Sequence, residues 1–175
     1  MAHLRKTGEA AFSKVEKINS ELFSLTYGAI VTQLLKDYEE VDATNEQLEK
    51  MGYNIGIRLV DEFLAKAQIT ACQHFSETAE VIAKVGFKMF LGVSAEVVNS
   101  SEREFSLQMS DNPLAEFVEL PEQYNQLAYS NMLCGVLRGW IACLPSCTAL
   151  LPLTRFARRH AMSILSSHHG TPHRW

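Results

Sequence analysis

The chain has 175 residues, a length typical of one domain, with 47% hydrophobic and 21% charged residues, which excludes the disordered and fibrous classes. Its formal net charge of -4 gives no reason to expect a nucleic-acid partner. The charge is unevenly distributed. Up to and including Glu122 there are 20 acidic residues and 11 lysines and arginines, a net charge of -9, whereas five arginines and no acidic residue follow. This change indicates that the C-terminal segment has a different origin or role.

The N-terminal residues 1–18 are polar and mixed in charge, and we expect them to form a flexible arm. They lack the apolar stretch of a secretory signal, so we expect a cytosolic protein whose four cysteines stay reduced. The most apolar stretch, residues 140–153, is interrupted by two prolines. It falls short of the roughly 20 apolar residues that a membrane-spanning helix needs.

Two amphipathic helices are predicted next. The first begins near Ser20, and its apolar residues recur at intervals of three or four. They are Phe23, Tyr27, Ile30, Leu34 and Tyr38. The second helix runs from Thr44, which forms a capping-box pattern with Gln47, to about residue 67. Gly52 and Gly56 fall on one face of it, which indicates either close approach by another backbone or simple tolerance of glycine.

A third helix is predicted from Ser76 or Thr78 to a stop at Gly92, followed by a loop over residues 94–103. Alternation of apolar and polar residues predicts a strand over 105–110.

A turn at Asp111-Asn112-Pro113 and a second strand over 117–120 complete a predicted β-hairpin. A fourth helix is predicted over 127–140, and the helical pattern fails beyond Gly139.

Enzyme motifs do not appear in the sequence. Phosphate-binding loops, dinucleotide-binding glycine patterns, zinc-protease motifs and the serine hydrolase motif are all missing, so the sequence predicts no catalytic function and no cofactor. His74 lies two residues from Cys72, but no set of base, orienting group and oxyanion donors accompanies the pair. Cysteines and histidines of the C-terminal segment match no tight metal-ligand spacing, and we predict no metal site. They are Cys143, Cys147, His160, His168, His169 and His173.

Two features of the third helix and the connection before it admit more than one interpretation. Cys72 is either a small buried hydrophobic residue or the attachment point of an acyl chain, which would need a dry tunnel. Lys84 and Lys88 are four residues apart. They form either a solvated face or a basic surface that faces acidic lipid.

Several longer blocks carry a resemblance to a known family. They are SELFSLTYGAIVTQLLKDYE (20–39), MGYNIGIRLVDEFLA (51–65), ETAEVIAKVGFKMFLG (77–92), EFSLQMSDNPLAEFVELP (104–121) and YSNMLCGVLRG (129–139). In their order and spacing, these blocks resemble the Bet-three subunit family of the transport protein particle (TRAPP) vesicle-tethering complex. The resemblance covers about residues 17–139, which we take as one domain over 19–139.

The resemblance implies an α+β fold, with helices packed on one side of a small twisted antiparallel sheet. It implies a non-catalytic subunit in ER-to-Golgi transport that is cytoplasmic and peripheral at the cis-Golgi and endoplasmic reticulum. Related small TRAPP subunits are the implied partners, in a heterodimer or a homodimer formed chiefly through the first two helices. A Rab-type GTPase is an indirect partner.

The resemblance also implies a site. A fatty acyl group, palmitate by expectation, is held as a thioester on Cys72 within a narrow hydrophobic channel. Gly86 matches the small channel-lining residue, and glycine there keeps the channel open or widens it. Lys84 and Lys88 match a surface that turns toward Golgi membranes.

The chain departs from the family after Gly139. Residues 140–175 look like a divergent, disordered tail, so we expect the end of the fourth helix and the last strand of the sheet to be missing. A contribution of this segment to GTPase activation is in doubt for the same reason. Two alternatives therefore stand beside the tethering subunit: a stand-alone acyl- or lipid-binding protein, and an inactive splice-variant product.

Overall fold

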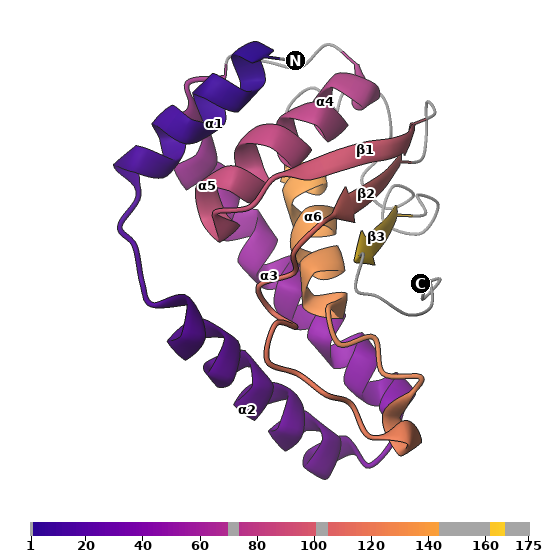
Figure 1. Cartoon of the computed structure of the whole chain (residues 1–175). Coiled ribbons are helices and arrows are strands. Elements are labelled where there is room, and N and C mark those ends of the chain that lie inside the picture. The colour runs from indigo at the N-terminus through magenta and orange to yellow at the C-terminus, as the bar shows by residue number, and fades with distance from the viewer. Residues whose placement is uncertain (1, 70–73, 101–104, 144–161, 167–175) are drawn as a thin grey trace.

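The computed structural model describes residues 2–69, 74–100, 105–143 and 162–166. Its helices, in chain order, are α1 (Ala2–Lys14), α2 (Ser20–Tyr38), α3 (Val41–Ala67), α4 (Phe75–Val81), the π-helical segment η1 (Ile82–Gly86), α5 (Phe87–Leu91), the 3-10 turn η2 (Glu122–Tyr124) and α6 (Asn131–Cys143). The strands are β1 (Ala95–Ser100), β2 (Phe105–Met109) and β3 (Met162–Ser166). Helices α3 to α6 lie on one side of the small sheet (Figure 1), which confirms the predicted fold class.

Helices α3 and α6 lie in direct backbone contact, and this contact forms the centre of the molecule. A Cβ atom added to Gly52 would lie 2.9 Å from the carbonyl carbon of Met132, and one added to Gly56 would lie 2.9 Å from that of Val136. Gly135 and Gly139 make the reciprocal contacts from α6 to the backbone of α3. The close-approach interpretation of the two α3 glycines is therefore confirmed.

The boundaries of these two helices differ from the predictions. Helix α3 begins at Val41, and Thr44 lies inside it, where its hydroxyl donates to the Glu40 carbonyl at 3.1 Å. The capping box is therefore not used. Helix α6 begins at Asn131 and continues to Cys143, past Trp140, because its apolar face keeps helical spacing and stays buried.

Helix α1 occupies residues that we expected to form a flexible arm. Gly8 and Ala11 are buried, and a Cβ atom added to Gly8 would lie 3.3 Å from the Lys88 Cβ and 3.4 Å from the Val85 Cα. The helix is therefore packed directly on η1 and α5. Small residues permit this approach, but they carry little of the apolar periodicity from which a packed helix is recognised.

Helix α2 begins at Ser20, as predicted, although the neighbouring Asn19 is its N-cap. The Asn19 side chain accepts a hydrogen bond from the Leu22 amide at 2.9 Å. The Tyr27 hydroxyl donates to the Tyr129 carbonyl, and the two rings meet edge to face with centroids 5.1 Å apart. One face of α2 is thereby held against the connection between β2 and α6.

The predicted helix over residues 76–92 forms as the run α4–η1–α5, and Gly92 stops it in a left-handed conformation with φ of 73°. The predicted strand over 105–110 is also confirmed, with Phe105, Leu107 and Met109 buried.

The predicted hairpin is wrong. Residues 113–117 form turns, and β2 pairs instead with β1, antiparallel, with Val97 opposite Leu107. The sequence predicts a loop over residues 94–103, where β1 forms. The polar residues at the end of this stretch hide the strand pattern.

The divergent segment supplies a third strand at the edge of the sheet. Residues 162–166 pair with β2 in parallel, with Ile164 opposite Leu107. We expected a sheet strand to be missing here. Sequence pattern did not indicate this pairing, because the strand is short and its partner lies far away in the chain.

Within the described ranges, no helix combines the length and the apolar character that crossing a membrane requires.

We expect Gly135→Ala to lower the free energy of unfolding by about 2 kcal/mol, because a Cβ atom there would lie 2.9 Å from the carbonyl carbon of Glu49 and the amide nitrogen of Tyr53. Backbone atoms cannot rotate out of its way. Urea denaturation followed by circular dichroism measures the change. Gly28→Ala is the control, because its Cβ would meet only the Tyr129 hydroxyl, at 3.3 Å. Equal destabilisation of the two variants would contradict the packing described above.

Candidate functional site

The candidate site is the apolar interior enclosed by α3, the α4–η1–α5 run and α6. Side chains from all three elements belong to one buried cluster. Those that are almost fully buried include Phe63, Ile82, Val85, Met89 and Leu137. An interior of this composition suits a ligand without polar groups, such as the hydrocarbon chain of a fatty acid.

Gly86 lies at the end of the π-helical segment η1, and it is buried. Single-turn π-helical segments within α-helices are often found at functional sites. The atoms nearest to a Cβ added to Gly86 all belong to the ring of Trp140. Among them, Cζ3 would lie 2.8 Å and Cζ2 3.3 Å from the added Cβ. The space that glycine leaves open at this position is therefore occupied by an indole ring.

Trp140 is 2% exposed and is held by two further aromatic rings. Its ring lies edge to face with Phe63 of α3, at a centroid distance of 4.7 Å, and with Phe90 of α5, at 5.7 Å. The sequence analysis did not identify it as a site residue. A signal was available, because Leu133, Leu137 and Trp140 follow helical spacing along one face.

Cys72, the predicted acylation site, lies outside the described residues. The residues that flank residues 70–73 can be placed: Ala67 is buried, and Ile69 and Phe75 both pack against the core cluster. The Phe75 ring lies 5.3 Å from the Phe105 ring of β2. The chain is therefore anchored at the apolar interior on both sides of the segment that contains Cys72.

His74 begins the described chain after that segment. It is the N-cap residue of α4, in an extended conformation, and its carbonyl accepts a hydrogen bond from the Thr78 amide at 3.1 Å. Its backbone thus starts the helix that leads to Gly86.

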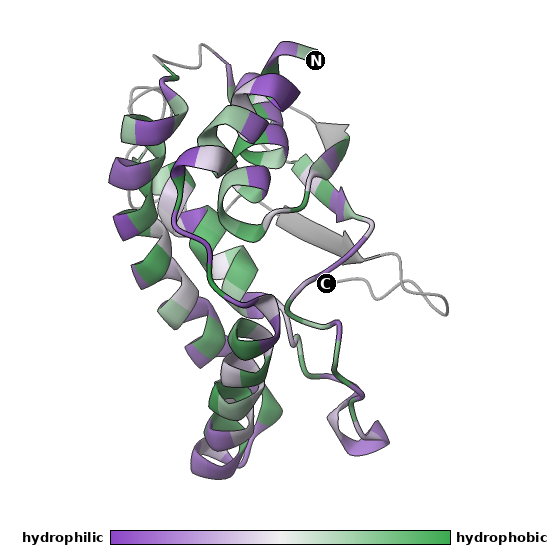
Figure 2. Cartoon of the chain, turned by 60° about the vertical axis from the view of Figure 1, so that its left-hand side comes forward, coloured by the Kyte–Doolittle hydropathy of each residue, from purple (hydrophilic) through white to green (hydrophobic). Residues whose placement is uncertain are grey.

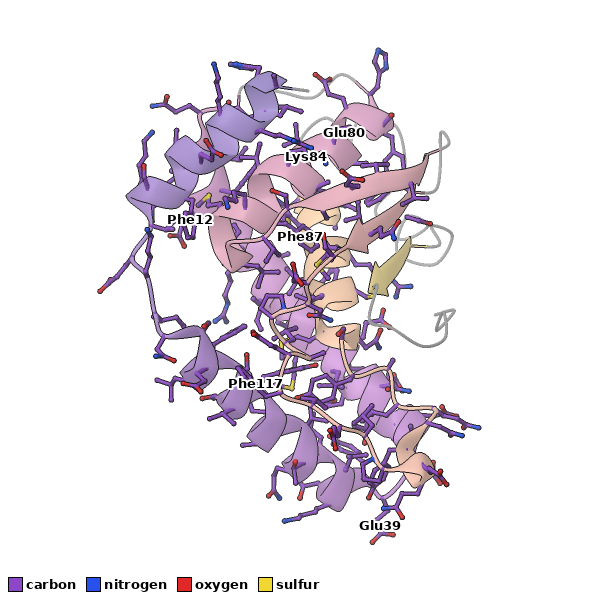
Figure 3. All side chains as sticks on the ribbon, viewed as in Figure 1. Phe12, Glu39, Glu80, Lys84, Phe87 and Phe117 are labelled. Carbon is purple, nitrogen blue, oxygen red and sulfur yellow. The ribbon has the colours of Figure 1, made fainter. Side chains whose placement is uncertain are left out.

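Lys84 lies beneath α1 (Figure 3). The backbone of Lys84 and the Cβ atom of Lys88 both lie against Gly8 of α1. Lys84 is only 5% exposed, and its ammonium group donates to the Ala95 carbonyl at 2.8 Å. Lys88 donates to the Gly92 carbonyl at 3.0 Å. The two lysines line a polar cleft of about 420 Å³, together with Arg5, Glu9, Ser94, Glu96, Gln108 and Ser110. Two of these residues are acidic, so the cleft is mixed in charge.

Two cysteines of α6 differ in environment. Burial raises the pKa of the half-buried Cys134 to about 11, whereas Cys143 is exposed, and its pKa is raised by partial burial and by the charge of Asp61. Among the residues described, no three histidine, cysteine, aspartate or glutamate side chains come together as metal ligands. Of the C-terminal cysteines and histidines that the sequence analysis weighed as metal ligands, only Cys143 falls within the described residues.

We expect Cys134 to react with iodoacetamide at least about tenfold more slowly than Cys143 at pH 8. A thiol with a pKa near 11 is about one thousandth thiolate at that pH, and the thiolate is the nucleophile. Because raising the pH deprotonates Cys134, its rate should climb steeply toward pH 11. Peptide mapping by mass spectrometry measures both rates in one sample. Similar rates for the two thiols at pH 8 would show that Cys134 is not shielded.

The comparisons with known proteins point to one family. A family model described as transport protein particle (TRAPP) component matches residues 23–149, which is more than half of the chain. A trafficking protein particle complex subunit 3 from Dictyostelium discoideum is 65% identical over 137 residues, covering 77% of this chain and 74% of the relative. The transport protein particle subunit bet3 of Schizosaccharomyces pombe is 57% identical over 139 residues, with the same two coverages.

Among solved structures, subunit 3 of the trafficking protein particle complex from Naegleria fowleri, covalently bound to palmitic acid, matches with a TM-score of 0.67 and 58% identity. The match covers 71% of this chain and 79% of that one. The resemblance seen in the sequence is thus confirmed, and the chain belongs to the TRAPP component family.

Proposed function

We propose that this chain is a non-catalytic, cytoplasmic subunit of a TRAPP-type tethering complex, acting in ER-to-Golgi transport at the cis-Golgi and endoplasmic reticulum. The observation that carries the proposal is an apolar surface on α2 that the rest of the described chain leaves uncovered. Family membership then identifies the kind of protein that covers it.

This surface, which we call the α2 surface, is formed by α2 and by the connection between β2 and α6. Figure 2 shows hydrophobic residues along the length of α2. Leu22 and Leu25 are 64% and 63% exposed. Phe117, labelled in Figure 3, and Leu120 are exposed as well. With Leu25, they line a groove between the two segments. Contiguous exposed apolar side chains of this kind are typical of protein–protein interfaces.

A related small TRAPP subunit is the occupant that we propose for the α2 surface. The relatives are subunits of a multi-subunit complex, so a chain of this family is expected to lie against other subunits. A second copy of the same chain is the alternative, and a test of partner binding separates the two.

We also propose that Cys72 carries a fatty acyl thioester whose hydrocarbon chain enters the apolar interior. Two observations support this: palmitic acid is covalently bound in the Naegleria fowleri structure, and both ends of the segment containing Cys72 pack on the core. With an acyl-coenzyme A as donor, the Cys72 thiolate attacks the thioester carbonyl. A new C–S bond forms, the original C–S bond breaks, and coenzyme A leaves as its thiolate.

Membrane contact and GTPase activation are the remaining parts of the proposal. Contact of Lys84 and Lys88 with acidic Golgi lipid requires α1 to uncover them, because Lys84 is buried beneath it. An indirect role in activating a Rab-type GTPase depends on residues 140–175, where the chain departs from the family pattern.

We expect Leu25→Glu to reduce recovery of related small TRAPP subunits by at least about tenfold, because the variant places a charge in the centre of an apolar interface. Folding should change by less than about 0.5 kcal/mol, since the side chain is exposed. Pull-down from cytosol followed by quantitative mass spectrometry measures the recovery. Val98→Glu on β1 is the matched control, an exposed apolar residue outside the α2 surface. Equal recovery by both variants would show that the α2 surface does not bind the partner.

We expect Cys72→Ser to abolish an acyl mass that hydroxylamine removes from the unsubstituted chain, because hydroxylamine cleaves thioesters. Each methylene of the chain buried in the interior contributes about 0.8 kcal/mol, so loss of the acyl group should also lower thermal stability. Intact mass of protein from cells, before and after hydroxylamine, is the measurement. Cys143→Ser is the control. A hydroxylamine-sensitive mass that survives Cys72→Ser would place the thioester elsewhere.

A further inference from the structure

We propose that Trp140 limits the length of the acyl chain that this protein accepts, by occupying the space beside Gly86. The inference rests on the proposed function, because it requires an acyl chain to enter the interior. It concerns a residue that the sequence places at the start of the divergent segment, directly after Gly139.

The indole of Trp140 lies in contact with Gly86. Positions that lack a side chain leave room for about one methyl group, and here Trp140 fills that room. One edge of the ring faces the glycine: Cη2 is the atom nearest to an added Cβ, and Cζ3 and Cζ2 follow at 2.8 and 3.3 Å. A methylene group and the ring cannot both occupy this volume, because carbon atoms in contact are separated by about 3.5 to 4.0 Å.

The ring is also held in place. Phe63 and Phe90 pack against it edge to face, with interplanar angles of 78° and 76°. The backbone below it is fixed as well, because the Trp140 amide would lie 3.0 Å from a Cβ added to Gly56 at the α3–α6 contact. Moving the ring aside would require repacking of two aromatic neighbours, so an incoming chain meets a fixed wall.

The indole nitrogen carries a further signal. Trp140 Nε1 is buried and has no hydrogen-bond acceptor among the described residues. Tryptophan N–H groups usually find a partner when buried, because leaving one unpaired is costly. The position of the indole nitrogen therefore offers it no acceptor, and a hydrocarbon group would lose no hydrogen bond there.

The consequence is a limit on length. An acyl chain that ends before Gly86 is unaffected, whereas a longer chain competes with the ring for the same volume. Each buried methylene raises the binding constant of the acyl chain roughly fourfold. Exclusion of two methylenes therefore lowers this constant more than tenfold. We therefore expect the extent of acylation to fall once the acyl chain is long enough to reach Gly86.

The experiment compares acyl-coenzyme A donors with 8, 10, 12, 14 and 16 carbons on the full-length chain and on the variant Trp140→Ala. Intact mass gives the extent of thioester formation at each length. For the unsubstituted chain we expect the extent to fall at least about tenfold between the shortest and the longest donors. For Trp140→Ala we expect the 16-carbon donor to react as fully as the shorter ones.

Three further variants serve as controls. In the double variant Trp140→Ala with Gly86→Leu, a leucine refills the space, and the length limit should return. Trp175→Ala removes the other tryptophan and should keep the profile of the unsubstituted chain. Because Trp140→Ala leaves a large hole and can fold poorly, Trp140→Leu is included. It should show an intermediate limit, with circular dichroism reporting the folded state.

The outcomes separate this inference from the proposed function. Full reaction of the unsubstituted chain with the 16-carbon donor overturns the length limit and leaves acylation of Cys72 standing. The length limit is also overturned, with acylation of Cys72 still standing, if folded Trp140→Ala and Trp140→Leu show the same dependence of thioester formation on donor length as the unsubstituted chain. Failure of every donor on every folded variant overturns acylation itself, and the length limit with it. A chain that accepts long donors only after substitution of Trp140 supports both.

Discussion

The backbone contact between α3 and α6 is the constraint on which the rest of this structure depends. Two helices can approach this closely only where small residues line the contact. Gly52 and Gly56 of α3 lie against the backbone of α6, and Gly135 and Gly139 of α6 lie against the backbone of α3. An ion pair between Arg138 and Glu49 joins the same two helices. Because carbonyl and amide groups of one helix lie against the glycines of the other, a single added methyl group would force backbone atoms to move.

This contact also determines what fills the interior. Gly139 is packed against α3, and the next residue along α6 is Trp140, whose ring reaches Gly86 across the space between the helices. Gly86 of η1 and Trp140 of α6 are thus in direct contact. Trp140 therefore fills the space that the missing side chain of Gly86 leaves open in the core.

The α2 surface and the interior beside Gly86 are formed by different residues. The α2 surface faces outward, and α2 is held in place by the Tyr27–Tyr129 pair. The interior beside Gly86 is enclosed, and α1 covers the helical run that forms one of its walls (Figure 1). Substitutions on the α2 surface and substitutions beside Gly86 therefore change different contacts. The polar cleft under α1 belongs to neither, since its lysines are engaged by backbone carbonyls.

The sequence by itself determined the main helices, the strand over 105–109 and the family, because periodicity reports the face that each segment buries. It also indicated that Gly52 and Gly56 meet another backbone, without identifying which one. Only the tertiary structure decided the partner of β2, the packing of α1 and the position of Trp140. The packing of α1 and of Trp140 depends on contacts between residues far apart in the chain, whereas β1 directly precedes β2 and lies next to a polar run that hides its strand pattern. A local pattern shows that a residue is buried, but the fold alone shows what it is buried against, and for Trp140 that neighbour is Gly86.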